Sequence, residues 1–137
     1  MSIDYSKYEP EWFGEFRRCE AWIEASLEYA HGAYAYGAFT IQDVFEDIMK
    51  GDMQFWPGKK SVAVTQIVPY PNKKIVHCFV AAGDIIELEV THDKIIAWAK
   101  TEGCEAMTLS GGSGWTERFL RDKDYTCAQV QMIRKFV

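Results

Sequence analysis

The chain has 137 residues, of which 48% are hydrophobic and 26% are charged, and its formal net charge at pH 7 is −5. This apolar content excludes a disordered chain, and the length fits one domain that buries about two thirds of its unfolded surface. The acidic balance, without any run of basic residues, argues against a general phosphate-binding surface, so we expect no nucleic-acid partner.

The first predicted element is an amphipathic helix over residues 10–30, because apolar residues recur there every three or four positions. A connection over residues 31–39 combines turn-forming glycines with aromatic residues. Thr40 is placed to cap a second helix over residues 41–50, which ends at Gly51. The predicted buried stripe of this second helix consists of Ile41, Val44, Phe45 and Ile48.

Strands follow the second helix. QFWPGKK at 54–60 predicts a short strand broken by a Pro-Gly turn, and the β-branched run at 61–68 predicts another. PYPN then makes a short connection to a strand over residues 73–83, which indicates an antiparallel hairpin whose second strand is buried on both faces.

A long helix is predicted from Asp84 to Glu102, and Gly103 stands where a left-handed cap is needed. A strand at 105–111 follows it. The glycine-rich stretch GGSGW then opens a short helix over 116–123, and residues 125–136 are predicted as a last strand. One face of the long helix carries Ile85, Leu88, Ile95, Trp98 and Ala99.

This order predicts the α/β class: a single domain over residues 1–137 with a mixed sheet of about six strands and helices on its faces. Residues 1–39 form its aromatic-rich helical segment, and residues 40–137 form the sheet with its covering helices. The expected core includes Val64, Val76, Phe79, Ile95, Trp98, Leu109 and Met132.

Location and metal chemistry can also be judged from the sequence. No apolar stretch approaches the ~18 residues that span a bilayer, and the start lacks the pattern of a secretion signal, so we expect a cytoplasmic protein. Cysteines and histidines are dispersed without a CxxC pair. We therefore expect no metal site, and cysteines that are buried and reduced.

Three single residues are considered as candidates for catalytic chemistry, and His77 is the one that fits best. His77 lies on a predicted strand, where Glu87 or Asp84 would orient it as a general base, although a packing role is the simpler interpretation. His92 falls beside the apolar face of the long helix and is interpreted as a core residue with satisfied hydrogen bonds. Ser113 does not fit the G-x-S-x-G pattern of a nucleophilic serine, because the local sequence is GGSGW.

The N-terminal segment holds half of the aromatic residues of the chain. One helix face cannot bury all of them, and Trp and Tyr dominate binding hot spots. A protein partner or self-association through this segment is one interpretation, and an aromatic cover over the sheet is the other. The ten residues are Tyr5, Tyr8, Trp12, Phe13, Phe16, Trp22, Tyr29, Tyr34, Tyr36 and Phe39.

A family resemblance rests on short motifs between residues 40 and 136. The order of strand, long helix ending AWAKTEGC, strand, short helix and final strand resembles the C-terminal half of GNAT-type N-acetyltransferases. TIQDVFEDIMKGDMQFW and the turn after the parallel strand are similar to segments of small GNAT-like proteins encoded by tailed bacteriophages. The turn is matched by Gly111, Gly114, Trp115, Glu117 and Arg118, with Thr116 where those relatives usually carry an acid.

The resemblance implies a cleft between the FVAAG and MTLSG strands that takes the pantetheine arm of acetyl-CoA, the implied cofactor. His77 is the implied catalytic residue. The GGSG loop is open to two interpretations, an anion-binding cradle of backbone amides or a tight glycine turn. The cofactor-binding candidates are Ala82, Gly83, Gly111, Gly112, Ser113, Gly114, Trp115 and Arg118.

Two departures from the family pattern weaken the acetyl-CoA site. Active members carry an Arg/Gln-x-x-Gly-x-Gly/Ala loop for the pyrophosphate, whereas this chain reads AAGDIIELEV, with an acid, Asp84, where a phosphate would sit. An ordinary N-cap of the long helix is the simpler interpretation of Asp84. The tyrosine that protonates the leaving thiolate in many members is replaced by Leu120, which cannot transfer a proton. Arg118 and Arg121 are the basic residues nearby, three apart on the short helix.

Two functions therefore remain open. The favoured one is a phage-type GNAT-like protein with a degenerate cofactor site that acts by protein binding, as a virion component or a modulator of a host factor. The alternative is an acetyl-CoA-dependent N-acetyltransferase acting on a protein or a small amine, because positioning and backbone hydrogen bonds can support acyl transfer.

Overall fold

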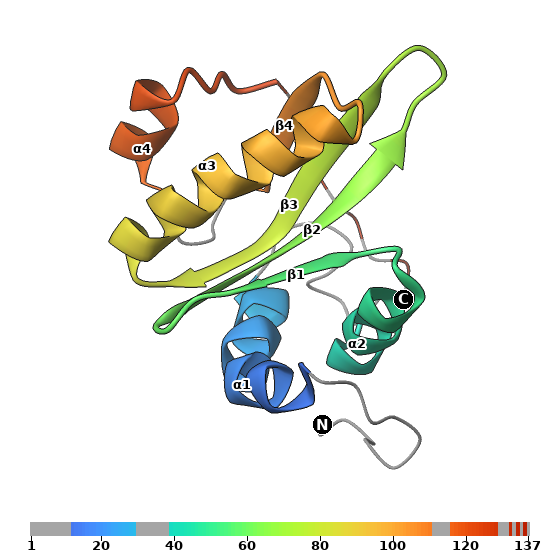
Figure 1. The fold of residues 1–137 in the computed structure, drawn as a ribbon, viewed down its shortest axis with the longest axis vertical. Coiled ribbons are helices and arrows are strands. Elements are labelled where there is room, and N and C mark those ends of the chain that lie inside the picture. Colours follow the sequence, from blue (N-terminus) through green and yellow to red (C-terminus); the bar gives the residue numbers. More distant parts are fainter. Residues whose placement is uncertain are drawn as a thin grey trace.

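The computed structural model describes residues 12–29, 39–110, 116–128, 132, 134 and 136. Its elements follow the order α1, α2, β1, β2, β3, α3, β4, α4 (Figure 1). Their bounds are Phe13–Tyr29 for α1, Ile41–Lys50 for α2, Gln54–Pro57 for β1, Ser61–Pro69 for β2, Lys74–Gly83 for β3, Ile85–Thr101 for α3, Ala106–Leu109 for β4 and Glu117–Asp122 for α4.

The sheet is mixed, with its four described strands in the order β1-β2-β3-β4. The first three strands pair antiparallel, as the short PYPN connection predicts, and β4 pairs parallel with β3. A register shift after Val64 leaves Phe79 as an extra residue between Cys78 and Val80, which is a β-bulge. The predicted mixed α/β class and the antiparallel hairpin are confirmed.

Local signals in the sequence set the ends of two helices. Thr40 caps α2 in a capping box, in which its hydroxyl accepts from the Asp43 amide and the Asp43 carboxylate accepts from the Thr40 amide. Gly51 ends α2 in the left-handed region, with φ of 83°. Gly103 follows α3 with φ of 85°, as predicted.

Helices cover the two faces of the sheet separately. α1 and α2 lie on one face, and α3 lies on the other together with α4 (Figure 1). The side chains that alternate along β2 and β3 therefore feed two separate hydrophobic clusters. The α1 cluster includes Phe16, Ile23, Phe45, Val62, Val64, Phe79 and Val80, and the α3 cluster includes Ala63, Val76, Cys78, Ala81, Leu88, Ile95 and Ala99.

Three expectations need correction. The described sheet has four strands rather than about six. The predicted last strand fails where it is described, because residues 125–128, 132, 134 and 136 are in no strand. Met132 is 88% exposed instead of lying in the core. The residue types at 125–136 are compatible with a strand, but only pairing with a neighbour makes such a segment one.

Most of the other core expectations are confirmed. Val64, Val76, Phe79 and Ile95 are buried, while Trp98 and Leu109 are partly buried against the α3 cluster. None of the described helices has the length and apolarity that crossing a bilayer requires.

Candidate functional site

The start of α3 is where a GNAT-type protein would hold the pyrophosphate of its cofactor. Here Asp84 is the N-cap, and its Oδ1 accepts from the amides of Ile86 and Glu87 at 2.8 and 3.1 Å. The Asp84 amide itself donates to the Lys60 carbonyl. These amides thus already have acceptors within the chain, and the acceptor carries the same sign of charge as a phosphate.

Gly83 serves a tight contact between strands. Its φ is +105°, and a Cβ at this position would lie 2.1 Å from the Lys60 carbonyl oxygen. The residue also pairs with Ser61 across the hairpin, and Ala82 pairs with Val62. The two cofactor candidates on β3 therefore lie in the β2–β3 ladder, beside the turn that precedes β2.

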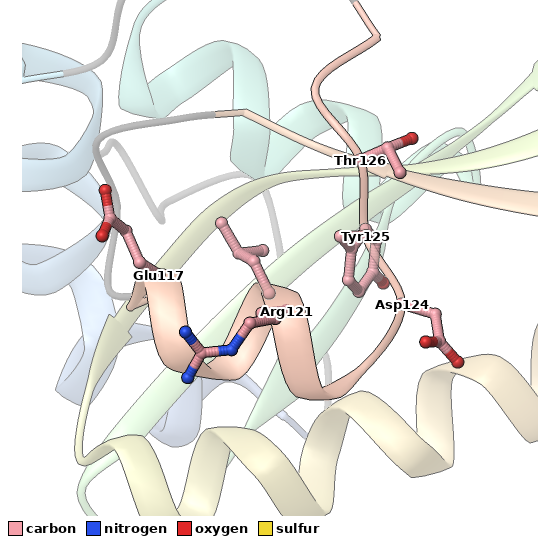
Figure 2. A pocket seen from close by; sticks show the side chains of 6 residues that line it. Glu117, Arg121, Asp124, Tyr125 and Thr126 are labelled. Atoms are coloured by element: carbon pink, nitrogen blue, oxygen red, sulfur yellow. The ribbon is translucent and has the colours of Figure 1, made fainter.

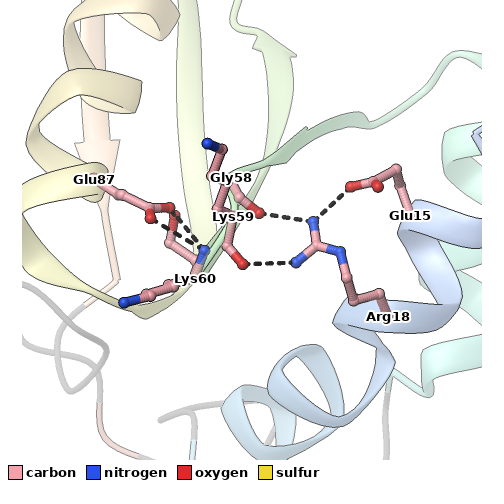
Figure 3. Close-up of polar contacts among 7 residues, drawn as sticks. Glu15, Arg18, Gly58, Lys59, Lys60 and Glu87 are labelled. Carbon is pink, nitrogen blue, oxygen red and sulfur yellow. Dashed lines mark hydrogen bonds and ion pairs between the residues drawn. The ribbon is translucent and has the colours of Figure 1, made fainter.

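That turn, Pro57 to Lys60, is held from both faces of the sheet (Figure 3). From α1, Arg18 donates to the carbonyls of Lys59 and Gly58 at 3.0 and 2.7 Å. From α3, the Glu87 carboxylate accepts from the Lys60 amide and the Ser61 hydroxyl. These bonds lower the pKa of Glu87 below its usual value. Glu87 thus connects α3 to this turn and has a structural role.

His77 lies on β3 as predicted, but its partners are not the predicted ones. Its Nδ1 lies 2.6 Å from Thr108 Oγ1 and its Nε2 lies 3.0 Å from Ser110 Oγ. Asp84 caps α3 and Glu87 holds the turn, so neither acid orients this histidine, which corrects that expectation. Partial burial lowers the pKa of His77, so its ring is neutral at pH 7.

Sequence reasoning missed Thr108 and Ser110 as partners of His77. Thr108 lies directly opposite His77 in the parallel ladder, and Ser110 follows two residues later on the same face. The signal was the pattern T-x-S on one strand beside a histidine on its parallel neighbour. Only the register shows which residues of the two strands meet.

His92 is a core residue with satisfied hydrogen bonds, as predicted. Its Nε2 lies 2.7 Å from the Tyr125 hydroxyl and its Nδ1 lies 3.2 Å from Asp93 Oδ1. The rings of Phe119 and Tyr125 meet the imidazole edge-on. Burial lowers the pKa of His92 and raises that of Tyr125. This network anchors α4 and residue 125 to α3.

An open hollow of about 530 Å³ lies beside α4 (Figure 2). Leu120, the residue that replaces the expected tyrosine, is part of its wall. Arg118 and Arg121 each lie within 4 Å of Asp122, and both are largely exposed, so they are paired and solvated. The hollow is lined by Glu117, Leu120, Arg121, Asp124, Tyr125 and Thr126.

Some candidates lie outside the described residues. Gly111, Gly112, Ser113, Gly114 and Trp115 are among them, so the glycine loop stays a prediction. In the N-terminal segment, the described rings of Trp12 and Phe16 pack on Phe45 and Phe55 within the α1 cluster. These two serve as cover over the sheet. The side chains of Tyr5, Tyr8, Tyr29, Tyr34 and Tyr36 are not described.

The four cysteines are free, but only two of them are buried. Burial raises the pKa of Cys78 to about 12, which keeps it an unreactive thiol. Cys104 is half-buried and Cys127 is exposed, which corrects the expectation that all four are buried. Across the described ranges, no three His, Cys, Asp or Glu side chains are grouped to hold a metal ion.

Comparison with protein-family models, with curated proteins and with solved structures finds no match to this chain.

Proposed function

We propose that the chain is a phage-type protein of GNAT-like fold whose acetyl-CoA site is degenerate, and that it acts by binding a protein, as a virion component or as a modulator of a host factor. The element order supports the fold: two helices, three antiparallel strands, a long helix, a parallel strand and a short helix. Apart from the final strand, which the described residues at 125–136 do not form, this is the arrangement that the sequence resemblance implies.

The observation that carries the loss of the cofactor site is the state of the α3 N-terminus. A diphosphate is held there by backbone amides that have no other acceptor. In this chain the Asp84 carboxylate accepts from the Ile86 and Glu87 amides, and Gly83 packs against the Lys60 carbonyl. Asp84, Glu87 and Glu89 would also repel the bound diphosphate.

Titration with acetyl-CoA tests this proposal directly. We expect no heat of binding by calorimetry and no shift in the midpoint of thermal unfolding at millimolar acetyl-CoA. A ligand at 100 times its dissociation constant would add about 2.7 kcal/mol to the free energy of unfolding, so binding is easily detected. Asp84→Asn, which keeps a capping side chain while removing its charge, is the variant for comparison in the same titration. Binding by the parent protein would contradict the degenerate site.

The proposed binding surface is the N-terminal aromatic segment, through its tyrosines. Phe16 lies in the α1 cluster and Trp12 packs against it. Tyr34 and Tyr36 are therefore the better positions for substitutions that test binding. Sedimentation equilibrium should show self-association that Tyr34→Ser with Tyr36→Ser removes. A parent protein that stays monomeric would exclude self-association, and photo-crosslinking from position 34 in infected cells would then test for a separate partner.

An acetyl-CoA-dependent N-acetyltransferase acting on a protein or small amine is the second candidate. It is favoured by one observation: β4 ends at Leu109, whereas β3 continues to Gly83 and carries a neutral histidine near the point where pairing ends. Release of free CoA in the presence of an amine measures this activity. His77→Gln should then lower the rate about 100-fold or more if His77 is the base. Absence of any CoA release would remove this candidate.

A further inference from the structure

Three polar side chains form a continuous hydrogen-bonded row across β3 and the end of β4. Ser110 Oγ lies 3.0 Å from His77 Nε2, and His77 Nδ1 lies 2.6 Å from Thr108 Oγ1. The backbone fixes the row, because Thr108 is the ladder partner of His77 and the Ser110 amide donates to the Cys78 carbonyl at 3.2 Å.

The order of the three groups matches that of an activated nucleophile. A serine hydroxyl becomes nucleophilic when a neutral imidazole can take its proton, and a third group must hold that imidazole in the right tautomer. If Nδ1 donates to Thr108 Oγ1, the lone pair of Nε2 faces the Ser110 hydroxyl. The lowered pKa of His77 leaves the ring neutral and able to accept that proton at pH 7.

We propose that Ser110 is a nucleophile that takes an acyl group from an activated carboxylic ester, with His77 as its general base and Thr108 as the residue that positions His77. This inference is independent of the function proposed above, because it needs no coenzyme A. It assigns a catalytic role to Ser110 that neither the sequence motifs nor the family resemblance contains.

The step balances as ordinary acyl transfer. Ser110 Oγ bonds to the ester carbonyl carbon while its proton moves to His77 Nε2. The bond from carbon to the leaving oxygen then breaks, and His77 returns the proton to the departing alcohol. Water attacks the acyl-serine with His77 again as base, which releases the acid and restores the hydroxyl. Because Thr108 is neutral, the imidazolium lacks a carboxylate partner, which in a serine protease costs about 10⁴ in rate. Turnover is accordingly slow.

The test uses p-nitrophenyl acetate with the full chain. We expect release of nitrophenol together with one acetyl group on Ser110, located by peptide mass spectrometry after an acid quench. Ser110→Ala should abolish this adduct, and His77→Gln should slow its formation about 100-fold. Ser26→Ala, which changes a serine of α1 that is half-buried like Ser110, is the matched control and should leave the adduct unchanged.

A spectroscopic check and two further variants separate catalysis from structure. Ser110→Ala should keep the circular dichroism and the thermal unfolding midpoint of the parent protein, which excludes a folding effect as the cause of the missing adduct. Thr108→Val should shift the pH profile of acetylation, and Thr108→Ser should restore it, because only a hydroxyl fixes the His77 tautomer.

Two outcomes would overturn the proposal. One is the absence of an acetyl group on Ser110 in the folded parent protein. The other is acetylation of Ser110 at the same rate in His77→Gln. In either case the row only satisfies the hydrogen bonds of a half-buried imidazole.

Discussion

The two faces of the sheet are stabilised in different ways. On the α1 face, the rings of Trp12, Phe16, Phe45 and Phe55 meet with centroids 5.2–5.7 Å apart. On the α3 face the buried residues of the α3 cluster are small or aliphatic, and the three buried polar side chains of the described residues, Ser61, Thr65 and His92, belong to this side.

The difference shows that aromatic packing is concentrated on the α1 face and buried polar interactions on the α3 face. Aromatic contacts need only shape and burial, so the α1 cluster should respond to changes in volume and little to pH. The polar side chains of the α3 face depend on specific partners: Thr65 donates to Gln54 and accepts from Trp56, and His92 contacts Tyr125. That face should therefore respond to pH and to the loss of single hydrogen bonds.

The largest expected effect comes from the aromatic face. Phe16 is fully buried and contacts three other rings, so Phe16→Ala should lower the free energy of unfolding by about 3–5 kcal/mol. Urea unfolding followed by fluorescence measures the loss. Phe16→Leu, which fills most of the space, is the control and should cost less. A loss below about 1 kcal/mol would mean that this cluster contributes little.

A smaller loss is expected on the α3 face. Trp98 is partly buried and packs edge-on against Trp56 at 5.5 Å. Trp98→Ala should lower the free energy of unfolding by about 2 kcal/mol, because only part of the ring leaves an apolar contact. The same urea experiment applies. A loss equal to that of Phe16→Ala would remove the proposed contrast in packing.

The pH response should identify His92. Burial lowers its pKa in the folded state below the value of 6.5 for an unfolded histidine. Between these two pKa values the unfolded chain binds the extra proton, so this contribution is full above pH 6.5 and is lost as the pH falls through the folded pKa. His92→Gln should flatten the dependence of stability on pH in this window.

A second histidine offers the comparison between faces. The pKa of His77, which lies on the opposite face of the sheet, is also lowered by burial. His77→Gln should therefore also flatten the dependence of stability on pH. Nuclear magnetic resonance titration of the two rings would assign each contribution. A folded pKa at or above 6.5 for His92 would contradict the interpretation of the α3 face.

Glu87, which connects α3 to the turn at 57–60, should give a weaker dependence of stability on acid pH. The pKa of Glu87 is lowered by its bonds to Lys60 and Ser61, so the stability it provides is present above the usual pKa of 4.5 and is lost as the pH falls through the folded value. Glu87→Gln should destabilise the chain at pH 7 and remove this part of the acid response. Glu89→Gln, two residues along and exposed, is the control. An equal dependence of stability on pH in the two variants would mean that the hydrogen bonds of Glu87 do not stabilise the fold.

The smallest effect is expected on the surface of α4. Arg118 and Arg121 are exposed and pair with the exposed Asp122, so Arg118→Ala with Arg121→Ala should change the free energy of unfolding by less than about 0.5 kcal/mol. Thermal unfolding at low and high salt measures this. A larger loss would show that these two side chains contribute to the stability of the fold.

Much of the fold was predictable because its signals are local. The periodicity of α1, the Thr40 and Asp84 caps, the glycines at 51 and 103 and the short PYPN connection each act within a few residues. The described residues of the last predicted strand are in no strand, because a strand requires a pairing partner elsewhere in the chain. Met132 failed for the same reason.

The candidate site depended on distant residues, and the sequence could give only part of it. His77 was identified by residue type, but its partners Thr108 and Ser110 lie more than 30 positions away and meet it only through the parallel register of β3 and β4. The same holds for the turn at 57–60, which Arg18 and Glu87 hold from opposite faces.

By itself the sequence determined the helices, their caps, the hairpin and the mixed α/β class, because backbone geometry and hydrophobic periodicity are properties of neighbouring residues. The tertiary structure decided which side chains meet across strands, which aromatic residues enter the core and which acids become structural. These outcomes depend on strand register and on packing between distant segments, and no local pattern encodes either one.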